Sequence, residues 1–455
     1  MRLPVAVLLI ALTVQAASGA NFEKADGYRG IWYFNQPTND EYVYKYSGGL
    51  GTYCANHIPM AVYAPEVSKT FFVYGGTTPG NDTLLEMVSY YDHATGKVPR
   101  PTILMDKKTT DAHDNPVIAL DDAGHVWVFA SSHGTSRPSY IFKSKKPYDI
   151  DDFDMVFKTN FSYPQPWYIP GGGFLFMHTR YQPGRACYWM TSPDGITWSD
   201  GHCLAYIAQG HYQNTWPFGN RVGSTFNYHP EKLGLNYRTN LYYVQTGDMG
   251  ATWKNVAGEP VQTPITNIQN PALVRDYEAE GLKIYINDLN YDGAGNPVIF
   301  YVTTKGWNPG PDNGPREWRV AHWTGATWEF HKVTDCDNNY DMGSIYIEPD
   351  GVWRVIGPAI PGPQPWNPGG EIGVWISKDE GKTWEMTGQL TRNSEFNHTY
   401  VRRPLNANPG FYAYWADGHG RKPSPSRLYF ADKDGNVNRL PYNMPKDFAT
   451  PEAIP

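Results

Sequence analysis

The sequence predicts an all-β fold, a ring of seven four-stranded blades, from its composition and from one turn motif that recurs along the chain. The 455 residues include 45 Gly and 38 Pro, and the aromatic residues are 33 Tyr, 19 Phe and 16 Trp. So many turn-forming residues imply short elements joined by tight connections, and the aromatic residues favour strands. With 40% hydrophobic and only 18% charged residues, the chain is neither a coiled coil nor a charged disordered protein.

The turn motif occurs in three nearly complete copies and one degenerate copy. The complete copies are SPDGITW at 192–198, TGDMGATW at 246–253 and SKDEGKTW at 377–384, and the degenerate copy is TGATW at 324–328. In each complete copy the Asp can accept hydrogen bonds from turn amides, the Gly permits a positive φ, and the Trp can pack between sheets. These repeats resemble the Asp box of bacterial neuraminidase-type propellers, so their Asp residues are interpreted as structural.

The spacing of the copies fits one blade per repeat. Trp198 and Trp253 are 55 residues apart, and Trp328 and Trp384 are 56 apart. Seven blades are therefore expected, beginning near Thr52, His113, Tyr163, Tyr212, Gln269, Asn339 and His398. The strand around Gly30–Tyr33 is expected to complete the last blade and close the ring. A β-sandwich is the alternative, but it would not explain a regular repeat.

The N-terminus predicts export. Arg2 precedes an apolar run and small residues that end at Ala20, which is typical of a signal peptide at residues 1–20. Residues 21–455 are then a single propeller domain, secreted to the cell exterior or periplasm and expected to be monomeric. No later segment has the roughly 20 apolar residues that a membrane span needs. The net charge of −7, without a basic run, argues against nucleic acid and membrane partners.

The cysteines suggest one disulfide. Cys187 and Cys203 flank the first turn motif almost symmetrically, so they would face each other across a hairpin and could form a cross-strand disulfide. Cys54 and Cys336 have no such relationship, and free thiols or metal ligation remain open for them.

Strand direction predicts that several polar residues share one face of the propeller. In an up-and-down blade, the chain before the first strand, the end of the second and the start of the third lie together. His113 opens and His133 closes one predicted hairpin. Two blades later, Tyr212 opens the first predicted strand and Arg238 opens the third. The residues predicted to bind substrate on this face are His57, Tyr163, Gln165, Arg180, Arg185 and His229.

Several segments together resemble a known family. They are Asp111-Ala-His113-Asp-Asn-Pro116 with His133-Gly134 twenty residues later, Tyr163-Pro-Gln165, Gly210–Gln213, Phe226–Pro230 and Arg238–Tyr243. They resemble the neuraminidase-type repeat family that contains secreted propeller polysaccharide lyases, among them ulvan lyases and relatives that cleave rhamnose–glucuronate linkages. The family also holds a glycoside hydrolase branch, so the resemblance leaves the reaction open.

The resemblance implies β-elimination on an anionic, uronate-containing polysaccharide, with no cofactor required for the chemistry. His113 and Tyr212 would then be the base and acid pair, and His133 and Arg238 would bind and neutralise the uronate carboxylate. Arg180 and Arg185 are rivals for the arginine role, and which histidine takes the proton stays open. Ulvan lyases of this type carry a structural metal, so calcium or zinc is possible here, although no ligand cluster has a transferable spacing.

Three other functions are weighed against a lyase. A sialidase would need three arginines, a Tyr nucleophile with a Glu partner and usually an Arg-Ile-Pro motif, but this chain reads Tyr28-Arg29-Gly30-Ile31. A rhamnosidase-like hydrolase would use the same fold, through a histidine such as His57. A non-catalytic propeller would use its Trp and Tyr side chains as platforms for sugar rings.

Overall fold

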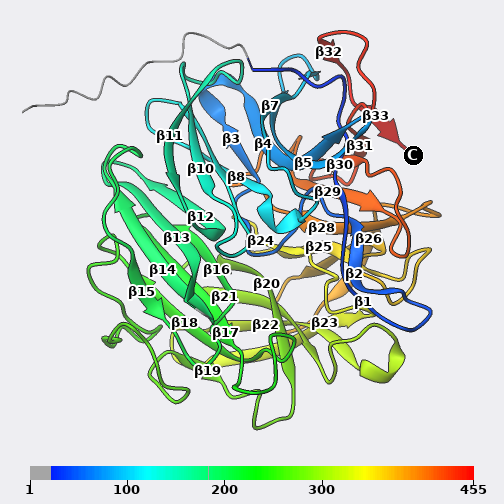
Figure 1. Ribbon diagram of the computed structural model, residues 1–455. Coiled ribbons are helices and arrows are strands. Elements are labelled where there is room, and N and C mark those ends of the chain that lie inside the picture. The colour runs from blue at the N-terminus through cyan, green and yellow to red at the C-terminus, as the bar shows by residue number, and fades with distance from the viewer. Residues whose placement is uncertain (1–21, 183) are drawn as a thin grey trace, which may run out of the picture.

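A computed structural model describes residues 22–182 and 184–455, so the predicted signal peptide lies outside the described residues. In this part of the chain, seven antiparallel sheets form a ring, as the all-β propeller prediction requires (Figure 1). The described residues also form three short 3-10 helices, which are η1 (Pro65–Val67), η2 (Ala112–Asp114) and η3 (Pro311–Asn313). None of the described helices is long and apolar enough to span a membrane.

The first three blades follow the chain in order, and each has its first strand at one edge of the sheet. Blade one holds β3 (Ala61–Ala64), β4 (Lys69–Thr78), β5 (Asn81–Asp92) and β7 (Thr102–Asp106). Blade two holds β8 (Pro116–Leu120), β9 (Val126–Ala130), β10 (Ser139–Ser144) and β11 (Phe153–Thr159). Blade three holds β12 (Ser162–Ile169), β13 (Gly173–Gln182), β14 (Gly184–Ser192) and β15 (His202–Ala205).

The remaining four blades keep the same order. Blade four holds β16 (Gln213–Phe218), β17 (Arg221–Tyr228), β18 (Thr239–Thr246) and β19 (Leu273–Arg275). Blade five holds β20 (Lys283–Tyr291), β21 (Pro297–Thr304), β22 (Arg316–Trp323) and β23 (Trp328–Cys336). Blade six holds β24 (Ser344–Ile347), β25 (Trp353–Ile360), β26 (Glu371–Ser377) and β27 (Glu385–Gln389). Blade seven holds β28 (Asn397–Arg402), β29 (Ala413–Gly418), β30 (Leu428–Ala431), β31 (Val437–Arg439) and β33 (Glu452–Ile454).

Two of the predicted blade starts are wrong. Blade one begins at Ala61 rather than near Thr52, and blade five begins at Lys283 rather than near Gln269. In blade four a long connection separates the third strand from the three-residue β19, which places the segment near Gln269 at the end of that blade. The other five starts lie close to the predicted positions.

The N-terminal strand does not complete the last blade, so this prediction is corrected. The strand β1 (Trp32–Pro37) pairs only with β2 (Tyr44–Gly49) among the described strands, and blade seven is completed by C-terminal strands. The segment before β1 still lies at the junction of the first and last blades. The amide of Ile31 donates to the Gly75 carbonyl on β4, and that of Gly30 donates to the Ser426 carbonyl before β30. Figure 1 accordingly shows the blue N-terminal hairpin beside the last blade, where β2 contacts β28 and β29.

A second, short pair of strands joins the first and last blades at their outer edges. The strand β6 (Val98–Pro99) of the first part of the chain pairs with β32 (Phe448–Ala449) near the C-terminus. The ring is therefore closed by C-terminal strands and by backbone contacts of the N-terminal segment.

The Asp boxes have the structural role predicted for them. Asp194 accepts hydrogen bonds from the amides of Ile196 and Thr197 at 2.8 and 2.7 Å. Gly195 has a φ of +72°, and a Cβ there would lie 2.3 Å from the Trp127 ring of the preceding blade. The boxes join the third and fourth strands, so they lie on the face opposite the predicted site.

The predicted disulfide is absent. Cys187 and Cys203, both among the described residues, are free thiols. A register shift between β14 and β15 places Cys203 opposite Tyr188 and Cys187 opposite Ala205. Because a shift of one position changes the face of the sheet to which a side chain points, the two thiols are not a cross-strand pair.

Candidate active site

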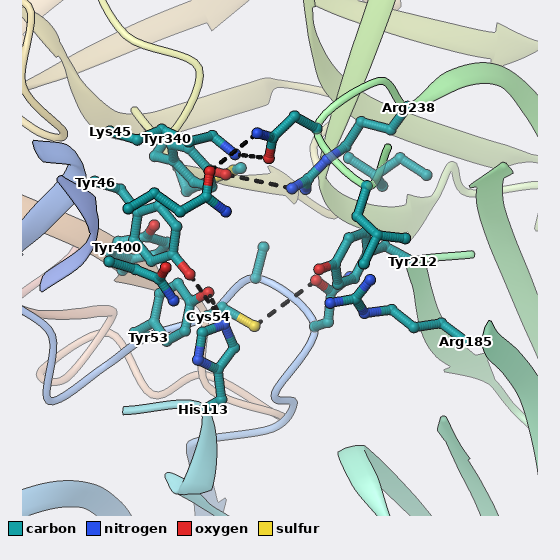
Figure 2. Close-up of a pocket in the computed structure, with 18 of the residues that line it drawn as sticks. Lys45, Tyr46, Tyr53, Cys54, His113, Arg185, Tyr212, Arg238, Tyr340 and Tyr400 are labelled. Atoms are coloured by element: carbon teal, nitrogen blue, oxygen red, sulfur yellow. Dashed lines mark hydrogen bonds between the residues drawn. The ribbon is translucent and has the colours of Figure 1, made fainter. Parts of the chain in front are cut away.

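A cavity of about 220 Å³ lies where strand order predicted the functional face, and Figure 2 shows its lining side chains. The cavity is lined by residues from blades one to seven and from the N-terminal hairpin. They are Asn35, Gln36, Lys45, Tyr46, Tyr53, Cys54, Ala55, Asn56, His113, His133, Arg185, Tyr212, Asn227, Leu235, Asn236, Arg238, Ile286, Tyr340, Met342 and Tyr400. All four predicted catalytic residues and one predicted substrate-binding residue, Arg185, therefore converge on it.

One carboxylate holds the two histidines together. Asp111 precedes η2, and its two oxygens accept hydrogen bonds from Nδ1 of His113 at 2.5 Å and Nδ1 of His133 at 2.7 Å. The two imidazole rings are stacked with centroids 3.9 Å apart. Since an ionised carboxylate only accepts, both rings carry their proton on Nδ1 and keep Nε2 as an acceptor.

The two histidines differ in what their Nε2 atoms contact. His113 is 3% exposed, and its Nε2 accepts from the Tyr53 hydroxyl at 2.7 Å, with the Tyr46 hydroxyl at 3.2 Å. Burial, together with the neighbouring His133 ring, lowers the pKa of His113 to about 4. His133 is half-buried, and its Nε2 has no protein partner among the described residues. His133 is therefore the histidine that can accept a proton from a ligand in the cavity.

Tyr212, which lies just before β16, has a hydroxyl group that is as available to a ligand as Nε2 of His133. Its side chain is half-buried, and its hydroxyl has no hydrogen-bond partner among the described residues. The guanidinium groups of Arg185 and Arg238 lie over its ring, at 5.1 and 4.4 Å from the centroid. Figure 2 shows Tyr212 between these two arginines. The phenol and two cations thus meet at one wall of the cavity.

Both arginines have donors to spare. Arg185 and Arg238 are each 8% exposed, and neither forms an ion pair with a described carboxylate. Arg185 donates from Nε to the Tyr181 hydroxyl at 3.1 Å, while its buried Nη1 has no partner. Arg238 donates from Nη2 to the Tyr340 hydroxyl at 3.3 Å, while its buried Nε has none. Buried cations without counter-charges favour an anionic ligand.

Three of the residues predicted to bind substrate lie behind the cavity wall instead. His57 is fully buried and stacked on Tyr163, with ring centroids 5.5 Å apart. Tyr163 in turn meets the Tyr212 ring edge to face at 5.3 Å, and His229 meets it at 5.2 Å. None of the three lines the cavity, and Tyr163 and His229 pack directly against the Tyr212 ring instead.

Gln165 and Arg180 also lie away from the cavity. Gln165 is buried between blades, where its amide donates to the Asn56 and Gln213 carbonyls and accepts from the Thr215 amide. Arg180 is exposed near the end of β13, with its guanidinium 5.4 Å from the Tyr188 ring centroid. Both residues lie at the end of the blade that strand order predicts, but their side chains point away from the cavity.

The N-terminal hairpin contributes cavity residues that were not predicted from the sequence. Lys45 on β2 is 2% exposed, and its Nζ donates to the Asn236 side chain. Burial, then the charges of Arg238 and Arg185, hold the pKa of Lys45 well below its usual value. Nothing in the sequence pairs this hairpin with blade four. Asp111, in contrast, stands two residues before His113 in the family-like segment, so that signal was present.

The metal expected from the family resemblance has one candidate grouping in the described residues, namely Asp111, His113 and His133. Their nitrogen–oxygen distances of 2.5 and 2.7 Å are hydrogen-bond lengths. Two ligands of one tetrahedral zinc ion, each about 2.0–2.2 Å from it, would lie roughly 3.3 Å apart. The cluster therefore fits a hydrogen-bonded carboxylate–imidazole group and does not fit a shared zinc ion.

Because several buried histidines have lowered pKa values, we expect the protein to lose folding stability at acidic pH. Burial lowers the pKa of His113 and His211 to about 4 and that of His57 and His178 to about 3. The unfolded chain binds these protons below about pH 6.5 while the folded chain does not, so stability falls from pH 6.5 towards 4. Each histidine should contribute about 2 kcal/mol to this loss at pH 5.

Thermal unfolding at pH 7.5 and pH 5 measures this effect, and we expect a clearly lower Tm at pH 5. A His178→Phe variant should show a smaller difference between the two pH values, because one proton-binding group has been removed. Replacement of the exposed His202 by Gln is the control. A Tm that is constant or rises on acidification would contradict the prediction.

Comparison with known proteins shows the family to which the chain belongs. The sequence profile described as "BNR repeat-containing family member" matches residues 87–336, more than half of the chain. The chain belongs to the BNR repeat-containing family. In this BNR repeat protein the matched segment runs from β5 in blade one to the end of β23 in blade five, and it includes the two histidines, Tyr212 and both arginines.

Two curated relatives of this BNR repeat protein are named ulvan lyase. One, from Nonlabens ulvanivorans, is 24% identical over 265 residues, which are 49% of this chain and 54% of that protein. The other, from Alteromonas sp. (strain LOR), is 20% identical over 388 residues, 74% of this chain and 75% of that protein. The first match thus spans about half of the relative's length.

Solved structures share the fold. An ulvan lyase of polysaccharide lyase family PL25 superposes with a TM-score of 0.70 at 16% identity, covering 90% of this chain and 96% of that one. The same enzyme is also known bound to the repeat GlcA(1-4)Rha3S. The polysaccharide lyase Uly1 gives a TM-score of 0.59 at 11% identity, covering 93% and 100%.

Proposed function

We propose that this BNR repeat protein is a polysaccharide lyase that cleaves a uronate-containing, ulvan-like glycan by β-elimination. The observation that carries the proposal is a free phenol, Tyr212, between two buried arginines without counter-charges, in the cavity that also holds the Asp111-linked histidines. The ulvan lyase relatives support the choice of substrate class. A neighbouring groove of about 470 Å³ shares Arg185 and Leu235 with the cavity and gives a polymer room to extend.

The two arginines can neutralise the uronate carboxylate, which is the first requirement of β-elimination. The proton at C5 of a uronate is weakly acidic until the carboxylate beside it is neutralised. A carboxylate placed at the Tyr212 wall would be neutralised by the guanidinium groups of Arg185 and Arg238, which lie 5.1 and 4.4 Å from the centre of the Tyr212 ring. These donors are fixed before substrate arrives, so they can stabilise the negative charge as it develops.

His133 and Tyr212 can supply the base and the acid, which are the second requirement of β-elimination. Nε2 of His133 takes the C5 proton, the C4–O4 bond breaks as the C4–C5 double bond forms, and the Tyr212 hydroxyl protonates the departing oxygen. His113, which the sequence favoured as the base, instead has its Nε2 occupied by Tyr53. It holds Asp111 and stacks on His133, so it acts as a positioning residue.

A hydrolase is supported less well. Glycosidases usually place two carboxyl groups about the scissile bond, and sialidases pair their tyrosine with a glutamate. Among the described residues, no Asp or Glu side chain lines the cavity. His57, the histidine considered for a rhamnosidase-like reaction, is fully buried.

One assay separates the candidate functions. The full mature protein is incubated with ulvan, with gum arabic and with other uronate polymers, and the ultraviolet absorbance of unsaturated uronate is followed together with new reducing ends. The lyase proposal requires both signals to rise together. Reducing ends without absorbance would establish hydrolysis, and binding without cleavage would establish a carbohydrate-binding propeller.

We also infer that the enzyme is exported and acts as a monomer. The charged residue, apolar run and small residues of positions 1–20 support export. Expression with its own leader, followed by N-terminal sequencing, should give a mature chain beginning at Asn21.

A further inference from the structure

The active-site cavity occupies only one end of the space that the first strands of the blades surround. A second hollow of about 650 Å³ lies at the opposite face. On β20, Ile286 lines the active-site cavity and Asn290 lines the second hollow. On β28 and just after it, Tyr400 and Arg403 hold the same two positions. Residues between these positions line neither hollow, so they lie at mid-depth on the axis of the propeller.

Arg402, at the end of β28, is a buried cation at this depth. It is 4% exposed, its Nη2 donates to the carbonyls of Ala55 at 3.3 Å and His57 at 2.6 Å, and its Nε has no partner. The carboxylate of Asp288, whose charge acts on Arg402, is already held by Arg403 through two contacts of 3.2 Å. Among the described residues, no carboxylate forms an ion pair with Arg402. One positive charge therefore stays uncompensated, which is costly in a protein interior.

Two buried asparagines at the same depth have amide donors without partners. Asn214 lies on β16 between Tyr212, which lines the active-site cavity, and Trp216, which lines the second hollow. Its Oδ1 accepts from Nδ2 of Asn56 at 2.9 Å, while its own Nδ2 has no partner. Asn287 is the extra residue of a bulge in β20, and neither atom of its amide has a partner. Buried donors without acceptors cost free energy unless a ligand accepts from them.

Loop 55–57, before blade one, joins Arg402 to Asn214. Arg402 donates to the carbonyls at both ends of the loop, and Asn56 between them donates to Asn214. Asn287 directly precedes Asp288, whose charge acts on Arg402, so its amide belongs to the same part of the axis. Blades four, five and seven thus each bring a donor to this point.

We propose that Arg402, Asn214 and Asn287 bind a small monovalent anion, chloride, on the axis of the propeller. Water would satisfy the two amides, but it would leave the charge of Arg402 uncompensated. The site is separate from the catalytic one, because none of these three residues lines the active-site cavity. The bound ion would hold the inner strands of three blades together and so stabilise the ring.

Bromide, which can replace chloride and scatters X-rays anomalously, locates the ion directly. Crystals of the full mature protein grown in sodium bromide should show an anomalous peak in contact with Nε of Arg402 and with the amides of Asn214 and Asn287. A water molecule without anomalous signal at this position, or bromide at the surface only, would overturn the proposal.

Thermal unfolding tests whether the ion binds in solution. A ligand that binds only the folded protein raises Tm with the logarithm of its concentration above Kd. Tm should therefore rise by equal increments for each tenfold increase in sodium chloride. It should not rise in sodium gluconate at the same ionic strength, because gluconate is too large for the site. Equal responses to the two salts would reject the site.

Asn287→Leu removes one donor without breaking a hydrogen bond within the protein, since neither amide atom has a protein partner. The variant should lose the bromide peak and raise the Kd for chloride roughly 10-fold or more, as expected for one hydrogen bond to an ion. Asn290→Leu, on the same strand but in the second hollow, is the control and should keep the wild-type response. A wild-type chloride response in Asn287→Leu would contradict the proposed site. If the variant does not fold, the bromide and chloride measurements on wild type decide.

Discussion

Tyr212→Phe is expected to lower kcat by roughly three orders of magnitude, with little change in KM or in Tm. The hydroxyl is the group that would protonate the departing sugar oxygen, and general acid catalysis contributes about 10²–10⁴-fold to enzymatic rates. Phenylalanine keeps the ring over which Arg185 and Arg238 lie, and it keeps the edge contacts with Tyr163 and His229. The carboxylate subsite and the packing should therefore survive the substitution.

The measurement is the initial rate of unsaturated uronate formation across a range of ulvan concentrations, with Tm measured on the same samples. Tyr63→Phe, which removes a half-buried tyrosine hydroxyl in blade one, is the matched control and should retain the wild-type rate. A Tyr212→Phe enzyme that keeps a tenth or more of the wild-type kcat would exclude the hydroxyl as the acid. A raised KM at unchanged kcat would mean that Tyr212 only binds the sugar.

The parts of this fold that local chemistry determines could be predicted from the sequence. The Asp boxes need only a turn, a carboxylate and a tryptophan within eight residues, so their role was visible. Strand order then located His113, His133, Tyr212 and Arg238 at one face, because direction in an antiparallel blade follows from position along the chain.

Features that depend on distant contacts could not be predicted in the same way. Lys45 enters the cavity because the N-terminal hairpin lies against the loop that carries Asn236, and no periodicity records that contact. The Cys187–Cys203 pairing failed because of a register shift, which spacing alone does not reveal. The family resemblance favoured His113 over His133 as the base. The hydrogen bond from Tyr53 to Nε2 of His113, which argues against this choice, cannot be seen in the sequence.

Asp111→Asn is expected to lower kcat by about 10²–10⁴-fold while leaving KM almost unchanged, because Asp111 does not line the cavity. The wild-type carboxylate accepts from Nδ1 of both histidines and so leaves both Nε2 atoms free of a proton. An asparagine can accept from one ring only, and its amide must donate to the other. If that other ring is His133, its proton moves to Nε2 and the base can no longer accept one.

The pH profile distinguishes this positioning role from a general loss of structure. The negative charge of Asp111 raises the pKa of His113, against the larger effects of burial and of His133. Removing that charge should lower the pKa of His113 further, and because a protonated His113 would place a positive charge against the stacked His133 ring, the acidic limb of kcat should move to lower pH. Asp122→Asn, which changes an exposed carboxylate in the turn of the same hairpin, should leave both the rate and the limb unchanged. An Asp111→Asn enzyme with an unshifted limb would show that Asp111 holds the loop in place without setting the protonation of the base.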